Sequence, residues 1–279
     1  ANWLSITRSG VTLDLMGTLA DQLSEHMPGL SDPDMALNNL DRFFAAARSR
    51  LALAAFFERD PEALPTLLQI FCSSQHLSDL LIRDAECFDL LRLTEGQPVA
   101  REVLVREICS DVAAATDDQD VMTVLRRHKQ RETLRIAYGD IVRRQRLETV
   151  TEQISTLAEA ICEAAVRAAR RKAEQQRGVP RRPDGQRARF VALALGKLGG
   201  QELNYSSDID LIATFPRAGE TDGRRVLDNE DFFARLVQRA STLIGETTAE
   251  GFGYRVDWRL RPFGTAGRLV LSFDAMEDY

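Results

Sequence analysis

Cysteine and histidine are scarce in this sequence, and their spacing excludes several kinds of site. The four cysteines of the 279 residues are widely spaced and form no Cys-x-x-Cys pair, so we expect neither a disulfide framework nor a zinc site. The three histidines are isolated, and no neighbouring motif marks any of them as a catalytic base. Free thiols suit a reducing compartment, and we expect a cytoplasmic protein. The cysteines are Cys72, Cys87, Cys109 and Cys162, and the histidines are His26, His76 and His128.

Long apolar runs are also missing. Arg48 and Arg50 interrupt the longest one, and the N-terminal residues contain no charged stretch that leads into an apolar one. We therefore expect a soluble protein with no membrane contact. The formal net charge of −6 argues against a nucleic-acid partner, because phosphate backbones are recognised by basic surfaces.

Helix signals dominate the sequence before about residue 180. Ser31-Asp32-Pro33 and Asp60-Pro61-Glu62 each place a capping side chain before a proline at the first helical position. Ser73 and Ser74 precede another candidate helix start. The alanine-rich residues 45–55 are predicted to form one core helix. This part of the chain should therefore be largely helical.

The longest predicted helix covers residues 149–177. Apolar residues recur there at spacings of three and four, and Gly178 followed by Pro180 ends the pattern. An exposed connection follows, and then a strand, a glycine turn, a second strand, a loop, a helix over residues 229–246 and a further strand. This order predicts an α+β protein.

The same order divides the chain into two predicted domains. Residues 1–180 should form a helical region that packs on the rest of the chain, and residues 181–279 should form a core around a small mixed sheet, which contains the candidate site described below. A hydrophobic fraction of 44% is sufficient for one large core or two modest ones.

Two carboxylates stand at the start of an apolar strand. Residues 208–215 are rich in strand formers, and side chains on a strand alternate between its faces, so Asp208 and Asp210 should project to the same side. Ile209 and Leu211 should then face a core. Two carboxylates so close repel each other unless a cation lies between them, and Mg²⁺ prefers oxygen ligands. The pair therefore predicts a magnesium site.

A later strand, predicted over residues 254–260, carries a third carboxylate. Alternation places Asp257, Arg259 and Arg261 on one face, and Trp258 and Leu260 on the other. Arginine offers a planar fork of donors that matches phosphate oxygens. Asp257 should therefore complete a cluster of three carboxylates with phosphate-binding arginines beside it.

A glycine turn precedes the carboxylates. Residues 191–195 are apolar and are predicted to form a buried strand, after which Gly199 and Gly200 should let backbone N–H groups approach an anion. Lys197 and Ser207 are further candidates for phosphate contact. The turn is a weak motif by itself, because it does not match Gly-x-x-x-x-Gly-Lys-Ser/Thr.

Several of these residues have a simpler interpretation. Lys197 could cap the turn in solvent, and Ser207 could bond only to local backbone groups. A cationic stretch upstream is predicted to be a solvated helix face with local ion pairs rather than a contact for a protein partner. This stretch contains Arg126, Arg127, Lys129, Arg131 and Arg135.

The motifs resemble those of the glutamine synthetase adenylyltransferase family. The resemblance is carried by ALGKLGGQELNYSSDIDL at residues 194–211, by residues 254–264 with LVLSF at 269–273, and by the helix motif LDNEDFFARLVQ at residues 227–238. It is strong over roughly the second half of the chain and weak before about residue 70. The resemblance implies a nucleotidyltransferase domain of the DNA polymerase β superfamily.

The family is bifunctional, and the resemblance implies a direction for this chain. One half of the enzyme attaches AMP from ATP to a tyrosine of glutamine synthetase, and the other half removes it by phosphorolysis to ADP. Asn204 with Ser206-Ser207, and Arg261-Pro262-Phe263-Gly264, are more similar to the removing half. We expect an adenylyl removase in which Asp208, Asp210 and Asp257 hold Mg²⁺.

The resemblance also implies partners and leaves alternatives open. Glutamine synthetase is the expected protein substrate, and the complete enzymes are regulated by glutamine and the PII signalling protein. The family continues beyond Tyr279, so we expect a partial version. The alternatives are the adenylylating half, a non-catalytic domain that senses a nucleotide or a partner, and a nucleotidyltransferase with another substrate.

Overall fold

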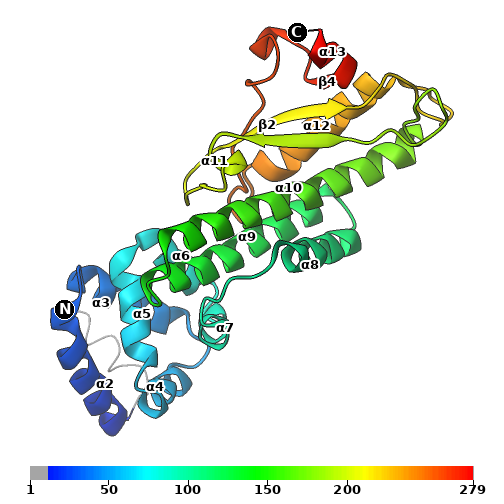
Figure 1. Ribbon diagram of the computed structural model, residues 1–279. Helices are drawn as coiled ribbons and strands as arrows, with labels where there is room; N and C mark the ends of the chain where they lie inside the picture. Colours follow the sequence, from blue (N-terminus) through cyan, green and yellow to red (C-terminus); the bar gives the residue numbers. More distant parts are fainter. Residues whose placement is uncertain (1–11, 279) are drawn as a thin grey trace. The chain divides into compact units, whose positions relative to one another are not determined.

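The computed structural model of the protein describes residues 12–278. The chain forms two compact units (Figure 1). One comprises the residues up to Gln97 together with Thr133–Val150, and the other comprises Pro98–Glu132 together with the residues from Thr151 onward. The predicted division into a helical region and a catalytic core at residue 180 stays a prediction. None of the helices within residues 12–278 is long and apolar enough to span a membrane.

The first unit is built from short helices around an apolar core. Two of the predicted caps are confirmed: the side chains of Asp32 and Ser74 each accept a hydrogen bond from the backbone N–H three residues later, at 2.9 and 3.4 Å. Phe43 lies at the centre of the core. The helices that belong wholly to this unit are α2 (Leu13–His26), η1 (Met27–Gly29), α3 (Pro33–Ala46), α4 (Arg50–Arg59), α5 (Ala63–Ser73), α6 (Gln75–Arg83) and α7 (Cys87–Thr94).

Two helix predictions in this unit are wrong. The alanine-rich residues 45–55 do not form one helix, because the Ser49 hydroxyl accepts the Ala52 N–H at 3.2 Å and begins a new helix there. The helix expected to begin at Pro61 begins at Ala63. The Asp60 carboxylate accepts the Glu62 N–H at 3.2 Å, and this local bond holds Pro61 in a turn.

The second unit combines long helices with the sheet. Its longest helix ends at Arg177, as predicted, and Gly178 follows in a left-handed conformation with φ of 85°. The helices that contribute to this unit are α8 (Arg101–Ala114), α9 (Asp118–Ile141), α10 (Leu147–Arg177), α11 (Gly196–Gly199), α12 (Asn229–Gly245), η2 (Gly264–Ala266) and α13 (Phe273–Glu277), of which α9 and α10 extend into the first unit.

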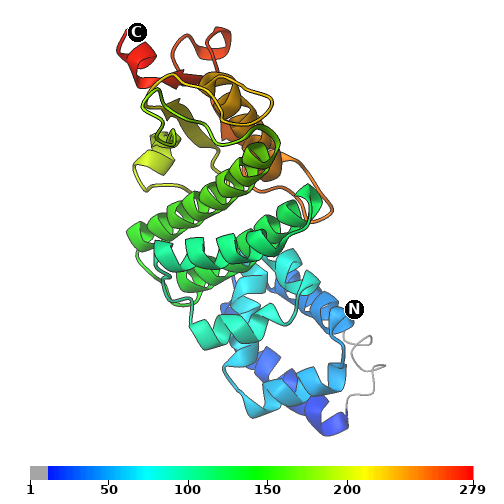
Figure 2. The ribbon, with the colours of Figure 1, turned by 90° about the vertical axis from the view of Figure 1, so that its right-hand side faces the viewer.

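The sheet is small and mixed, so the α+β prediction is confirmed. Its strands are β1 (Val191–Leu195), β2 (Ile209–Phe215), β3 (Val256–Asp257) and β4 (Val270–Ser272). Strand β2 pairs antiparallel with β1 along one side, and parallel with β3 and then β4 along the other. Helix α12 covers one face of the sheet (Figure 1, Figure 2), where Phe233 of α12 contacts Phe215 at 5.3 Å between ring centroids.

Two strand predictions need correction. Strand β1 is an edge strand rather than a buried one, and Leu193 is 42% exposed. The strand predicted over residues 254–260 ends at Asp257, and Leu260 beyond it is 56% exposed in a turn. Apolar content alone does not distinguish an edge strand from a central one.

The cationic stretch on α9 is not a solvated face. Arg126 is 1% exposed, and its guanidinium donates hydrogen bonds of 2.9 and 3.0 Å to the carbonyls of Leu243 and Gly251 and a further bond to that of Glu246. Carbonyls at a helix C-terminus have no partner within the helix, and they attract cations. Arg126 therefore fixes the end of α12 and the chain that leads into β3.

Candidate active site

Strand pairing brings two of the predicted carboxylates together. Asp210 of β2 is the register partner of Asp257 of β3, and the two strands are parallel. Paired positions on neighbouring strands lie about 4.8 Å apart and project to the same face of the sheet. Asp208 precedes Asp210 by two residues and lies just before β2. The predicted alternation is confirmed on the other face, where Ile209 and Leu211 are buried.

A guanidinium binds the third carboxylate from two sides. Nε of Arg259 donates to Oδ1 and Oδ2 of Asp257 at 3.0 and 2.9 Å, and a terminal nitrogen donates to Oδ2 at 2.5 Å. The backbone N–H of Arg259 donates to Oδ1 at 2.7 Å. The backbone bond closes a turn over two residues, which is why β3 stops at Asp257. These hydrogen bonds hold the pKa of the Asp257 carboxyl below its ordinary value.

The same guanidinium lies within the field of the other two carboxylates. The pKa of Arg259 is raised first by its hydrogen bonds to Asp257, and the charges of Asp208 and Asp210 add to that effect. Asp208 also accepts a hydrogen bond of 2.5 Å from Nε of Arg255. The site therefore combines three acids with two arginines, and both guanidinium side chains are mostly exposed.

The donor set suits a divalent cation, although the three acids are not gathered at one point. Within residues 12–278, no three His, Cys, Asp or Glu side chains are close enough together to hold a metal ion. Mg²⁺ commonly takes one or two carboxylates and completes its shell with phosphate oxygens and water. The pair of Asp210 and Asp257 on one sheet face satisfies that requirement.

Gly196 makes room for one of these carboxylates. Its φ of 54° lies in the left-handed region, and a Cβ on it would stand 2.8 Å from Oδ2 of Asp210. A side chain at this position would therefore displace Asp210. The sequence analysis did not nominate Gly196, although a glycine between a strand and a short turn is a sign of close backbone approach.

The other residues of the turn have structural contacts. A Cβ on Gly199 would stand 2.6 Å from the Ala194 carbonyl, so this glycine lets α11 pack against β1. The Gly200 N–H donates to the Gly196 carbonyl at 3.0 Å, so this donor is already used within the turn. Lys197 is exposed and makes no ion pair with any other described residue.

Ser207 and Arg261 are held by local hydrogen bonds. The Ser207 hydroxyl donates to Oδ1 of Asn204 at 2.6 Å and accepts the Asn204 N–H at 3.4 Å, so its bonds are local but include a side chain as well as the backbone. Arg261 donates to the Trp258 carbonyl at 2.7 Å and to that of Gly267 at 3.4 Å. Its charge still contributes to the lowered pKa of Asp257. The phosphate-binding roles expected for these residues stay predictions.

Helix α10 positions the loop between the glycine turn and β2. The hydroxyl of Ser155 accepts the Leu203 N–H at 3.1 Å, and the Glu159 carboxylate accepts a hydrogen bond of 2.6 Å from the Gln201 amide. The sequence analysis missed both contacts. No sequence signal marked Ser155, because it is not one of the apolar residues that recur at spacings of three and four along the predicted helix.

Comparison with known proteins gives consistent matches along the chain. A family model described as glutamate-ammonia ligase adenylyltransferase matches residues 64–279. Three curated relatives share the description bifunctional glutamine synthetase adenylyltransferase/adenylyl-removing enzyme.

These relatives cover most of the chain. The protein of Thioalkalivibrio sulfidiphilus is 40% identical over 91% of this chain and 26% of its own length. The protein of Shewanella loihica is 42% identical over 78% of the chain and 23% of its own length. The protein of Pseudomonas aeruginosa is 37% identical over 85% of the chain and 25% of its own length. The chain therefore spans about a quarter of the length of these relatives.

Proposed function

The chain belongs to the glutamate-ammonia ligase adenylyltransferase family, and from this premise we propose that it carries the adenylyl-removing activity of such an enzyme. The proposed substrates are adenylylated glutamine synthetase and orthophosphate, and the proposed products are ADP and unmodified synthetase. The observation that carries the proposal is the pairing of Asp210 with Asp257 on one sheet face beside Arg259.

The proposed reaction balances without a catalytic base. An oxygen of orthophosphate attacks the α-phosphorus of the tyrosyl ester, the bond between that phosphorus and the tyrosine oxygen breaks, and the proton of hydrogen phosphate passes to the tyrosine oxygen. This agrees with the isolation of the three histidines in the sequence. Both reactants are anions, so the main task of the site is to neutralise charge and hold them in line.

Different residues would neutralise the charge and hold the reactants in line. Asp210 and Asp257 would hold Mg²⁺ with Asp208 beside them, and a bound Mg²⁺ would polarise phosphoryl oxygens as a Lewis acid. Arg259 is 74% exposed and permanently charged, so it can exchange Asp257 for an oxygen of the incoming phosphate. Gly196 keeps the turn close to Asp210 without displacing that carboxylate.

Other parts of the proposal concern the complete enzyme. We propose a polymerase β-like fold for the catalytic part, a cytoplasmic location, ATP or ADP as bound nucleotide, and the PII signalling protein as a regulatory partner. The adenylylating activity is the second candidate, because the relatives are named for both activities. The two reactions differ in their products, because adenylylation from ATP releases pyrophosphate whereas phosphorolysis releases ADP.

The test is to incubate the protein with adenylylated glutamine synthetase, Mg²⁺ and phosphate, and to identify the released nucleotide. We expect ADP whose release depends on phosphate. Transfer of AMP from ATP to unmodified synthetase would support the second candidate instead. Inactivity in both directions would favour a non-catalytic sensing domain.

A pair of variants tests the site itself. Asp210→Asn should lower turnover by at least about a hundredfold, the scale of removing one group that stabilises charge in a transition state. The control is Asp184→Asn, because Asp184 is exposed and its hydrogen bonds are confined to neighbouring residues of the loop before β1. Equal loss in both variants would contradict the assignment.

A further inference from the structure

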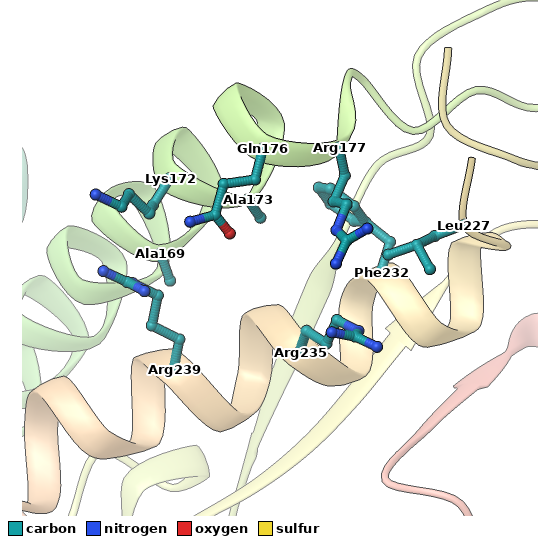
Figure 3. A pocket seen from close by; sticks show the side chains of 9 residues that line it. All are labelled: Ala169, Lys172, Ala173, Gln176, Arg177, Leu227, Phe232, Arg235 and Arg239. Atoms are coloured by element: carbon teal, nitrogen blue, oxygen red, sulfur yellow. The ribbon is translucent and has the colours of Figure 1, made fainter. Parts of the chain in front are cut away.

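A pocket lined by cationic side chains lies between two helices of the second unit. A pocket of about 130 Å³ separates the C-terminal part of α10 from α12. Figure 3 shows Arg177 and Gln176 extending from α10 toward α12, and Arg239 extending from α12 toward α10. Lys172 of α10 and Arg235 of α12 also line the pocket, whereas β2 and β3 contribute no residue to it.

The cations of this pocket have unused hydrogen-bonding capacity. Arg239 forms an ion pair with Asp118 through one terminal nitrogen, but its Nε is buried and has no hydrogen-bond partner among the described residues. A buried N–H without an acceptor is unfavourable, because it has lost its hydrogen bonds to water. Within residues 12–278, Lys172, Arg177 and Arg235 make no ion pair. An acceptor is therefore expected to enter the pocket.

The residues that line the pocket include no acidic side chain. Glu174 of α10 pairs instead with Arg170 at 2.9 Å and with Arg187. Among the described residues, the four pocket cations have one ion-pair partner, Asp118, which pairs with Arg239. Cations presented by two facing helices repel one another unless an anion lies between them. The pocket thus carries a net positive charge that its own residues do not neutralise.

The backbone holds the pocket in place before any ligand binds. Gly178 ends α10 in a left-handed conformation, and a Cβ on it would stand 2.3 Å from the Gly223 nitrogen. The Asp222 carboxylate accepts the Val179 N–H at 2.7 Å. These contacts fix Arg177 at the pocket edge, so binding would require little reordering.

We propose that this pocket binds a phosphate group. Arginine forks match the oxygens of phosphate, and the arginines that line the pocket come from both helices, Arg177 from α10 and Arg235 and Arg239 from α12. The volume is several times that of one water, about 30 Å³, yet far below the roughly 300–1,000 Å³ of sites that enclose whole organic ligands. The pocket therefore takes orthophosphate or the terminal phosphoryl group of a nucleotide.

The test is a calorimetric titration of the whole chain with inorganic phosphate in the presence of EDTA, which removes any contribution of divalent metal. We expect saturable binding at one site. Arg177→Gln and Arg235→Gln should each weaken that binding by roughly tenfold or more, which corresponds to about 1.4 kcal/mol, since each removes a charged hydrogen-bond donor. Lys172→Gln, at an exposed position, gives a third variant whose folding should be unaffected.

Two controls separate this site from other sources of binding. Arg106→Gln removes an exposed arginine of α8 and should leave the titration unchanged. Asp210→Asn should also leave it unchanged, because Asp210 does not line the pocket. A parallel titration with ADP distinguishes the two phosphate sources: tighter binding that remains sensitive to Arg235→Gln would identify the phosphoryl group of a nucleotide. Absence of saturable binding, or binding insensitive to the pocket variants, would overturn the proposal.

Discussion

At the scale of single residues, Gly196 determines how closely the glycine turn approaches Asp210. Gly196→Ala should lower the free energy of unfolding by about 1–3 kcal/mol, because alanine is disfavoured at positive φ and its Cβ would meet the Asp210 carboxylate. Urea denaturation measures this loss, and the proposed phosphorolysis should fall with it.

Gly185 provides the matched control for that substitution. Its φ is 78°, but a Cβ there would have no heavy atom within 4 Å. Gly185→Ala should therefore show the conformational cost alone and leave activity intact. Equal activity in the two alanine variants would show that the approach of Gly196 to Asp210 has no functional role.

Arg259 should control the charge of Asp257 in acid. The guanidinium lowers the pKa of Asp257, so this carboxylate contributes stability that is present above its unfolded pKa of about 3.9 and is lost as the pH falls through its lower folded pKa. In Arg259→Gln the pKa of Asp257 should rise toward its ordinary value. A carboxyl-carbon NMR titration measures the shift.

The control for this titration is Arg268→Gln. Arg268 pairs with Glu230 of α12 and makes no ion pair with Asp257. The pKa of Asp257 should stay low in this variant. A rise of similar size in both variants would mean that net charge, rather than the bidentate contact, lowers the pKa.

At the scale of elements, one side chain of α9 holds the C-terminus of α12. Arg126→Met would leave the carbonyls of Leu243, Glu246 and Gly251 without this donor, and we expect a loss of about 2–4 kcal/mol in the free energy of unfolding. The neighbouring variant Arg127→Met removes an exposed arginine and should change stability by no more than about 0.5 kcal/mol. Chemical denaturation measures the free energy of unfolding of both variants. Equal losses would contradict the conclusion that Arg126 holds the C-terminus of α12.

Lys129 belongs to the same contact between α9 and the chain before β3. Its ammonium donates to the Gly253 carbonyl at 2.5 Å and lies 4.6 Å from the ring centre of Tyr254. Burial lowers the pKa of Lys129 to about 8. Arg126 and Lys129 of the cationic stretch therefore make buried or half-buried contacts that the sequence did not predict, because their partners are backbone carbonyls far away in the sequence.

At the scale of the whole molecule, bound Mg²⁺ should stabilise one unit selectively. A ligand that binds only the folded state at 100 times its dissociation constant adds about 2.7 kcal/mol of stability. Amide hydrogen exchange of β2 should then slow by up to about a hundredfold when Mg²⁺ is added, whereas exchange in α3 and α5 of the first unit should not change. Asp210→Asn should abolish the effect, and slowing in that variant would place the metal elsewhere.

Local structure was predictable from the sequence wherever it depends only on one residue and its neighbours in the chain. The caps at Asp32 and Ser74, the end of α10 at Gly178 and the inward faces of β2 follow from capping, glycine conformation and alternation. Prediction was wrong where a local side-chain bond competed with periodicity, as at Ser49, which divides one expected helix into two.

The sequence by itself determined the α+β class, the family and the three carboxylates as candidates, because motif identity and residue spacing are properties of the chain alone. Only the tertiary structure decided that Asp210 and Asp257 are register partners, that β1 is an edge strand and that Arg126 is buried. Strand pairing and burial depend on segments far apart in sequence, and the cations of the α10–α12 pocket likewise meet only because two helices pack together.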